Sequence, residues 1–218
     1  MLLLSTAVLL VAALADSESC PEVYHIYCGV DSFGNKVLVR PLDRKRLEMA
    51  FFMTDSIHMA VRQYVENTSD PYMEIDSLNG GPRELIRYKG RLFLESTLGL
   101  FNIETGKCTQ MSNDHLTVRA KLEKLYGGTC SIQVTKSWRH DIVFNSDATY
   151  GVRTRKDGFD NFVGHVIVRV SKESVLKDAH IKIYGWGLHL GITFDVSGSI
   201  PKVIHNDVMP VTCVFPSN

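Results

Sequence analysis

The first fifteen residues constrain this chain more than any other segment. Leu2 to Ala15 are almost all Leu, Val and Ala, and the run ends in the small-x-small pattern Ala13-Leu14-Ala15. A short apolar run followed by this pattern is typical of a secretory signal peptide. A membrane-spanning helix needs roughly 20 apolar residues, and no later segment approaches that length. The sequence therefore predicts a signal peptide at 1–15 and a secreted protein, without a membrane anchor, at 16–218.

Secretion changes how the cysteines are interpreted, because disulfides form and persist in oxidising compartments. Five cysteines lie after the leader, and two bridges with one spare cysteine are the expected arrangement. Their spacing leaves the pairing open, and no Cys-x-x-Cys motif points to redox chemistry or a zinc site. The disulfide candidates are Cys20, Cys28, Cys108, Cys130 and Cys213.

One N-glycosylation sequon, Asn67-Thr68-Ser69, precedes the pair Asp70-Pro71. The sequence predicts a loop here, where a glycan could be attached without disturbing the core. In a eukaryotic secreted protein, Asn67 is therefore the expected glycosylation site.

Composition and motifs argue against several functional classes. Lys plus Arg equal Asp plus Glu at 24 each, so no global charge favours nucleic acid or an anionic membrane. Acidic residues predominate up to Asp114, and basic residues predominate from His115 to Trp186, so an anionic partner would prefer the second half. The eight histidines are isolated, and there is no phosphate-binding loop, dinucleotide fingerprint or Gly-x-Ser-x-Gly motif. We therefore expect neither a metal nor a cofactor.

Apolar periodicity predicts a long helix from Asp43 to Glu66. A second helix is predicted from Asn113 to Tyr126, ending at Gly127-Gly128. Between them, the polar and glycine-rich stretch from Asn67 to Tyr88 is expected to be a loop. β-leaning runs bounded by Gly, Asn and Asp follow the loop, at 91–103, 130–138, 141–145, 162–170, 180–184, 189–196 and 203–215.

This order of elements predicts an α+β fold, with one long helix packed on an antiparallel β-sheet. Residues 16–218 are expected to form a single domain, and a division near 106–113 is the alternative. The sequence shows no internal repeat.

The segment from Trp138 to His165 resembles the C-terminal half of the small fungal guanyl-specific ribonucleases. Five features match that family in order and near-correct spacing, namely Val143-Phe144-Asn145, Gly151-Val152, Thr154, Gly158 and Asn161-Phe162-Val163. An early aromatic-rich start around Cys28, then a helix, then a sheet is similar to the ribonuclease-like secreted effectors of plant-pathogenic fungi. The resemblance implies a microbial-ribonuclease-like fold, enlarged by an insertion or extension, in a protein delivered toward a host.

The resemblance also implies loss of catalysis. The family's general-acid histidine falls on Arg155, and an arginine does not exchange protons near neutral pH. The family's phosphate-stabilising arginine falls on Asp141, a charge of the wrong sign, unless a short slip brings in His140 or Arg139. The catalytic glutamate cannot be placed. The hydrolase alternative therefore depends on His140 acting with a glutamate across the sheet.

Binding is the function left by this interpretation. Arg139, Arg153, Arg155 and Lys156 would cluster near Phe162, and they could hold phosphate beside a stacking ring. The implied partner is a host protein or RNA, and the plainer alternative is that these basic residues only solvate one face. A glycan- or protein-recognition module using Tyr184 and Trp186 is the remaining alternative.

Overall fold

The computed structural model describes residues 25–67, 72–76, 84–87, 92–105, 108–176, 179–184, 191–206 and 210–216. The predicted signal peptide, Cys20 and Trp186 lie outside these ranges. The described part of the chain is mostly β-structure. None of its helices is long and apolar enough to span a membrane.

The first half is a closed eight-stranded antiparallel barrel in which each strand pairs with its neighbours in the sequence. Strand β8 returns to β1, where Gly29 pairs with Ile103, and the last residues of β4 pair with β5. A Cβ on Gly29 would lie 2.5 Å from the carbonyl oxygen of Asn102, so this closing ladder needs glycine. The strands are β1 (Tyr27–Val30), β2 (Lys36–Pro41), β3 (Arg46–Phe52), β4 (Ser56–Asn67), β5 (Tyr72–Ile75), β6 (Glu84–Arg87), β7 (Leu92–Ser96) and β8 (Gly99–Thr105).

The predicted helix at 43–66 is wrong, because this segment forms β3 and β4. Strand β3 is buried on both faces: Met49 and Phe51 point into the barrel, while Ala50 and Phe52 contribute to a second core outside it. Burial on both faces removes the alternation of polar and apolar residues that identifies a strand. On β4, the outer face is buried at Ile57 but exposed near the end of the strand. This change in burial along one strand also makes the spacing of apolar residues resemble that of a helix.

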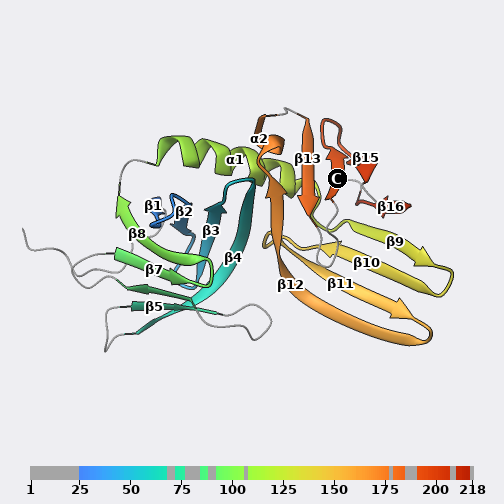
Figure 1. Ribbon diagram of the computed structural model, residues 1–218, viewed down its shortest axis with the longest axis horizontal. Coiled ribbons are helices and arrows are strands. Elements are labelled where there is room, and N and C mark those ends of the chain that lie inside the picture. Colours follow the sequence, from blue (N-terminus) through green and yellow to red (C-terminus); the bar gives the residue numbers. More distant parts are fainter. Residues whose placement is uncertain are drawn as a thin grey trace, which may run out of the picture.

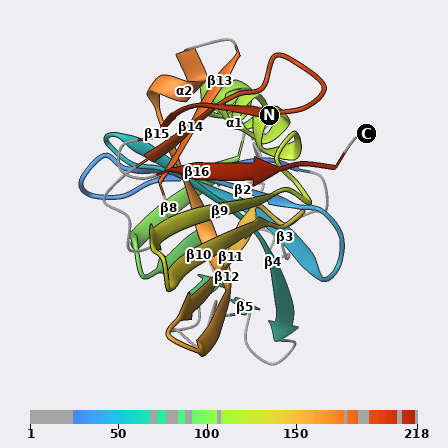
Figure 2. The same ribbon diagram turned by 90° about the vertical axis from the view of Figure 1, so that its right-hand side faces the viewer.

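The second half begins with a helix and continues as a second antiparallel meander. Its neighbour order is β9 through β15, and β16 returns to β9. Figure 2 shows β16, β9, β10 and β11 side by side in this order. The elements are α1 (Thr109–Glu123), β9 (Thr129–Thr135), β10 (Trp138–Phe144), β11 (Thr149–Lys156), β12 (Phe159–Ser171), α2 (Glu173–Leu176), β13 (His180–Tyr184), β14 (Gly191–Asp195), β15 (Lys202–Asn206) and β16 (Val211–Val214).

The two halves are joined where β12 pairs with β4, and they share one hydrophobic core. The end of β12 pairs with the start of β4, from Val168 opposite Met59 to Ser171 opposite Ser56. The helix α1 lies across the top of the molecule and buries Leu122 against the second half and the outer wall of the barrel (Figure 1). The halves are therefore joined by both backbone hydrogen bonds and apolar packing.

The architecture repeats, although the sequence shows no repeat. Strands β1 to β4 and β9 to β12 follow each other at matching intervals, and β4 and β12 are the longest strands in each half. The turns that follow β2 and β10 close in the same way: Leu42 N–H donates to the Arg46 carbonyl, and Asn145 N–H donates to the Thr149 carbonyl, both at 2.9 Å. The second half therefore follows the strand plan of the first.

Two disulfides are present, as expected. Cys28 bonds to Cys108 and Cys130 bonds to Cys213, with sequence separations of 80 and 83 residues. Each bond joins the second residue of a half's first strand to the end of the same half. The disulfides therefore repeat along with the strands.

The α+β fold and its ribonuclease-like arrangement are also wrong, because a barrel and a second meander replace the single sheet with one long helix. The expected loop at 67–88 contains β5 and β6. Of the two predicted helices, only the second is confirmed. It begins four residues earlier than expected, at Thr109, and ends at Glu123.

Candidate functional site

The outer face of β10, β11 and β12 gathers three of the four basic residues predicted as a binding site. Antiparallel partners point to the same face, and the register places Arg139 opposite Arg155 and Asp141 opposite Arg153. On β12, Asp160 lies opposite Arg155 and Phe162 lies opposite Arg153. We call this surface the arginine face, consisting of Arg139, Asp141, Arg153, Arg155, Asp160 and Phe162.

A tight hairpin turn sets this register. Asp157 and Gly158 connect β11 to β12 with φ of 49° and 83°. Two consecutive residues of positive φ are typical of a type I′ turn, for which Asp-Gly is a favoured sequence. The Asp-Gly pair between two alternating strands could therefore have located this hairpin from the sequence alone.

Charges alternate along the arginine face. Arg139 Nε lies 3.1 Å from Asp141 Oδ1, and Arg155 Nη1 lies 3.9 Å from Asp141 Oδ2. Asp160 joins the other end, 3.5 Å from Arg155 Nε and 2.8 Å from Arg153 Nε. Asp141 is buried, whereas both pairs of Asp160 are exposed, and exposed pairs contribute only about 0–1 kcal/mol each to stability. Their main effect is to hold the three guanidinium groups in one orientation.

The Phe162 ring lies over Gly151 and Gly164 on this face, with 60% of its surface exposed. Ideal Cβ atoms built on Gly151 and Gly164 would lie 2.7 Å and 3.2 Å from atoms of the Phe162 ring. Only glycine on the neighbouring strand leaves room for an aromatic ring to cover the sheet this closely. The ring is therefore held in place while one side remains open to solvent.

Lys156 lies on the opposite face of the same sheet. Its Nζ sits 4.9 Å from the Trp138 ring centre, and the Trp138 ring contacts His140 edge-on at 5.4 Å. The predicted basic cluster is therefore split, with Lys156 separated from the three arginines by the sheet.

His140, the alternative catalytic residue, also lies on this opposite face. Its Nδ1 is 2.9 Å from Thr154 Oγ1. Burial lowers its pKa, and the charge of Asp141 opposes that effect. The hydrolase alternative needs a glutamate facing this ring. Among the described residues, the hydrogen-bond partner of the His140 ring is Thr154 and its aromatic contact is Trp138. The geometry on this part of the chain therefore gives no support to acid–base catalysis by His140.

The remaining predicted sites are only partly covered by the structure. Asn67 ends β4, and its side chain is outside the described atoms. The Tyr184 ring lies 4.9 Å from the guanidinium carbon of Arg169 and 5.7 Å from Lys182 Nζ. Cations already stack on Tyr184, so it is not an open platform for a sugar.

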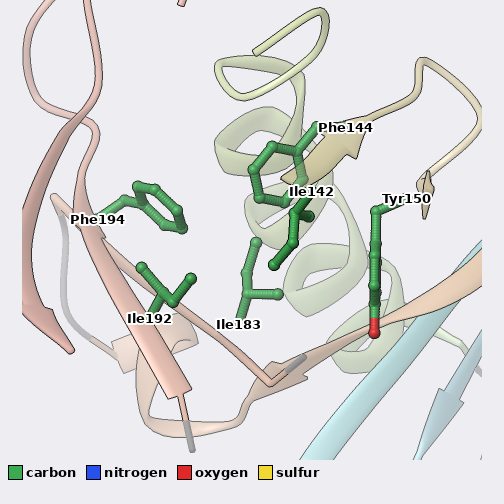
Figure 3. Close-up of a pocket in the computed structure, with 6 residues that line it drawn as sticks. All are labelled: Ile142, Phe144, Tyr150, Ile183, Ile192 and Phe194. Carbon is green, nitrogen blue, oxygen red and sulfur yellow. The ribbon is translucent and has the colours of Figure 1, made fainter. Parts of the chain in front are cut away.

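The interior of the second half contains a small apolar cavity of about 10 Å³ between the two layers of strands (Figure 3). This volume is barely that of one water, and an apolar lining of this kind stays dry. The lining residues are Ile142, Phe144, Tyr150, Ile183, Ile192 and Phe194. This cavity therefore cannot hold a small-molecule ligand without rearrangement.

A buried charge cluster beneath α1 was missed by the sequence analysis. Glu48 Oε2 lies 2.8 Å from Arg40 Nη2, 3.4 Å from His115 Nε2 and 3.4 Å from Arg119 Nη1. Burial raises the pKa of Glu48, but the combined influence of His115, Arg119 and Arg40 outweighs it and holds the pKa below its usual value. A glutamate inside the otherwise apolar run from Leu47 to Phe52 was the available signal. Because Glu48 and His115 are almost fully buried, we assign this cluster to attaching α1 to the barrel.

Comparison with known proteins adds no relative. No family model, curated protein or solved structure matches this chain. The functional argument therefore rests on the geometry of the arginine face and the surfaces around it.

Proposed function

We propose that this protein is a secreted, non-catalytic binding protein that contacts a partner protein through the arginine face. The observation that carries the proposal is the ordered chain of charges from Arg139 to Arg153, which ends beside the exposed ring of Phe162. These side chains stand on paired strands, so little conformational entropy would be lost when they are buried by a partner.

Arginine and aromatic residues dominate the binding energy of protein interfaces. Arginine contributes a planar group that can pair with carboxylates and pack on apolar surfaces at the same time. The arginine face offers three such groups around one fixed ring. It therefore suits a partner that presents carboxylates around an apolar side chain.

The acidic residues of the face favour a protein over RNA. Asp141 and Asp160 lie between the arginines and would repel successive phosphates of a nucleic acid backbone. A protein surface can instead offer both signs of charge in matching positions. RNA is therefore the competing outcome in the experiment below.

The test uses the oxidised mature protein and two variants. Arg155→Ala combined with Phe162→Ala removes the centre of the face. Lys156→Ala removes a neighbouring cation from the other side of the sheet and is the matched control. Proteins captured from the extracellular fluid around the producing cells are identified and purified, and binary affinities are then measured by calorimetry.

We expect the double variant to weaken binary binding at least 100-fold, since two hot-spot residues each contribute about 2 kcal/mol or more. Lys156→Ala should bind like the wild type. Equal binding by all three proteins would contradict the proposal.

A parallel assay with a fluorescent guanosine-containing RNA separates the alternatives. Salt-sensitive RNA binding that is lost in the double variant would indicate that the partner of the arginine face is RNA and not a protein. Cleavage above a heat-killed control would overturn the non-catalytic assignment.

A further inference from the structure

A groove of about 200 Å³ opens where the two halves meet beside the start of α1. Four segments form it: the β1–β2 turn, the end of β3, the first turns of α1 and the residue that follows β12. Its apolar surface comes from Phe33, Phe52, Met53 and Met111, and its polar rim includes Lys36, Asp114 and Lys172. This groove lies on elements different from those of the arginine face.

Phe33 is the most exposed of the large hydrophobic residues in the described ranges, at 88%. It sits at the tip of the β1–β2 turn, directly before Gly34, whose φ is 82°. A fully exposed phenylalanine contributes nothing to the core, because its apolar surface stays in water. Its position therefore needs another explanation.

The Asp31 carboxylate holds this turn in one shape. Its Oδ1 accepts hydrogen bonds from the backbone N–H groups of Phe33 and Asn35, and its Oδ2 accepts one from Asn35 Nδ2, all at 2.8 Å. Burial opposes ionisation of Asp31, but these hydrogen bonds outweigh it and lower its pKa. The Phe33 backbone is therefore ordered before any partner arrives, which reduces the entropic cost of binding.

The size of the groove selects its occupant. About 200 Å³ is smaller than the usual range for sites that hold drug-sized ligands, about 300–1,000 Å³. One large side chain from a protein segment would fit this space, with Phe33 packing against it.

The charges at the rim define the chemistry beside that side chain. Lys36 and Lys172 have no ion-pair partner among the described residues. Asp114, the carboxylate at the rim, already accepts a hydrogen bond from Gln110 Nε2 at 2.9 Å. The rim therefore has an excess of positive charge that complements a carboxylate.

We propose that this groove docks an extended protein segment in which a bulky apolar residue is flanked by acidic residues. The apolar side chain enters between Phe33, Met53 and Met111. A neighbouring carboxylate of the segment pairs with Lys36 or Lys172. This docking site is independent of the arginine face, so either proposal can fail without the other.

Two blocked peptides test the groove directly, Gly-Glu-Phe-Glu-Gly and Gly-Lys-Phe-Lys-Gly. The mature protein carries ¹³C-methyl methionine, so that Met53 and Met111 report occupancy by NMR. We expect saturable shifts of both methyl signals with the acidic peptide and at least tenfold weaker binding of the basic peptide. No saturable shift of either methyl at millimolar acidic peptide would overturn the proposal.

Variants show whether the shifts come from the docking described above. Phe33→Ala should weaken the acidic peptide about tenfold or more, and Phe159→Ala, which removes another exposed ring elsewhere on the molecule, should not. Lys36→Glu should narrow or reverse the preference between the peptides, and Lys45→Glu should leave it unchanged. Unaltered binding by both Phe33→Ala and Lys36→Glu would also overturn the proposal. The double variant of the arginine face should bind the acidic peptide normally, which keeps the two proposals separable.

Discussion

The two halves of this molecule use the same strand order but enclose their cores differently. The first half is closed by backbone hydrogen bonds, because β8 pairs with β1 along four residue positions. In the second half, the described residues form no ladder between β15 and β16. Its core is instead covered by α1 and by the outer wall of β2, β3 and β4. The comparison indicates that the first half supplies part of the second half's core, while the barrel interior is built from its own strands.

Removing each disulfide in turn tests this difference in closure between the halves, and it has the largest expected effect on stability. The two loops have nearly equal lengths, so chain entropy alone predicts the same loss for each bond, about 4.5 kcal/mol. We expect Cys130→Ala with Cys213→Ala to cost more than Cys28→Ala with Cys108→Ala. The second half lacks a closing ladder to replace its bond, and Cys130 is fully buried. Urea unfolding of the two double variants measures the difference, and equal losses would argue against unequal closure.

Matched core truncations are expected to have the next largest effect. Leu122→Ala in α1 removes a side chain from the shared core, and Leu94→Ala removes one from the barrel interior. Each should destabilise the protein by about 3 kcal/mol. Hydrogen exchange distinguishes them: Leu122→Ala should reduce protection mainly in β13 and β14, and Leu94→Ala mainly in β6 and β7. The same exchange pattern in both variants would mean that the halves open as one unit.

The buried cluster around Glu48 gives a smaller, pH-dependent effect. The pKa of Glu48 is lower in the folded state than in the unfolded chain, so its contribution is present above the unfolded pKa, about 4.5. That contribution is lost as the pH falls through the lower folded pKa. Glu48→Gln should therefore lose about 2 kcal/mol near neutral pH and less in acid. Thermal unfolding across pH 2–7 tests this, and a constant difference between variant and wild type would contradict it.

Parts of this architecture could be predicted from the sequence, and they are mostly local. The helix after Cys108 and most strands of the second half have a recognisable apolar periodicity and are bounded by glycines. The separation of Arg139 and Lys156 is less evident, because it depends on register: the strand partner of Arg139 is Arg155, so Lys156 points the other way. The groove beside Phe33 could not be predicted, since residues far apart in the chain form it.

The sequence by itself determined which cysteines were available for two disulfides, the second helix, and the β-structure of the second half. Only the tertiary structure decided that 43–66 is two strands, that the barrel closes, and that Cys28 bonds to Cys108. The physical reason is that residue periodicity records burial of one face of an element. When a strand such as β3 is buried on both faces by segments distant in sequence, the alternation of polar and apolar residues that identifies a strand is absent. Strand pairing and disulfide pairing then depend on which distant surfaces fit together.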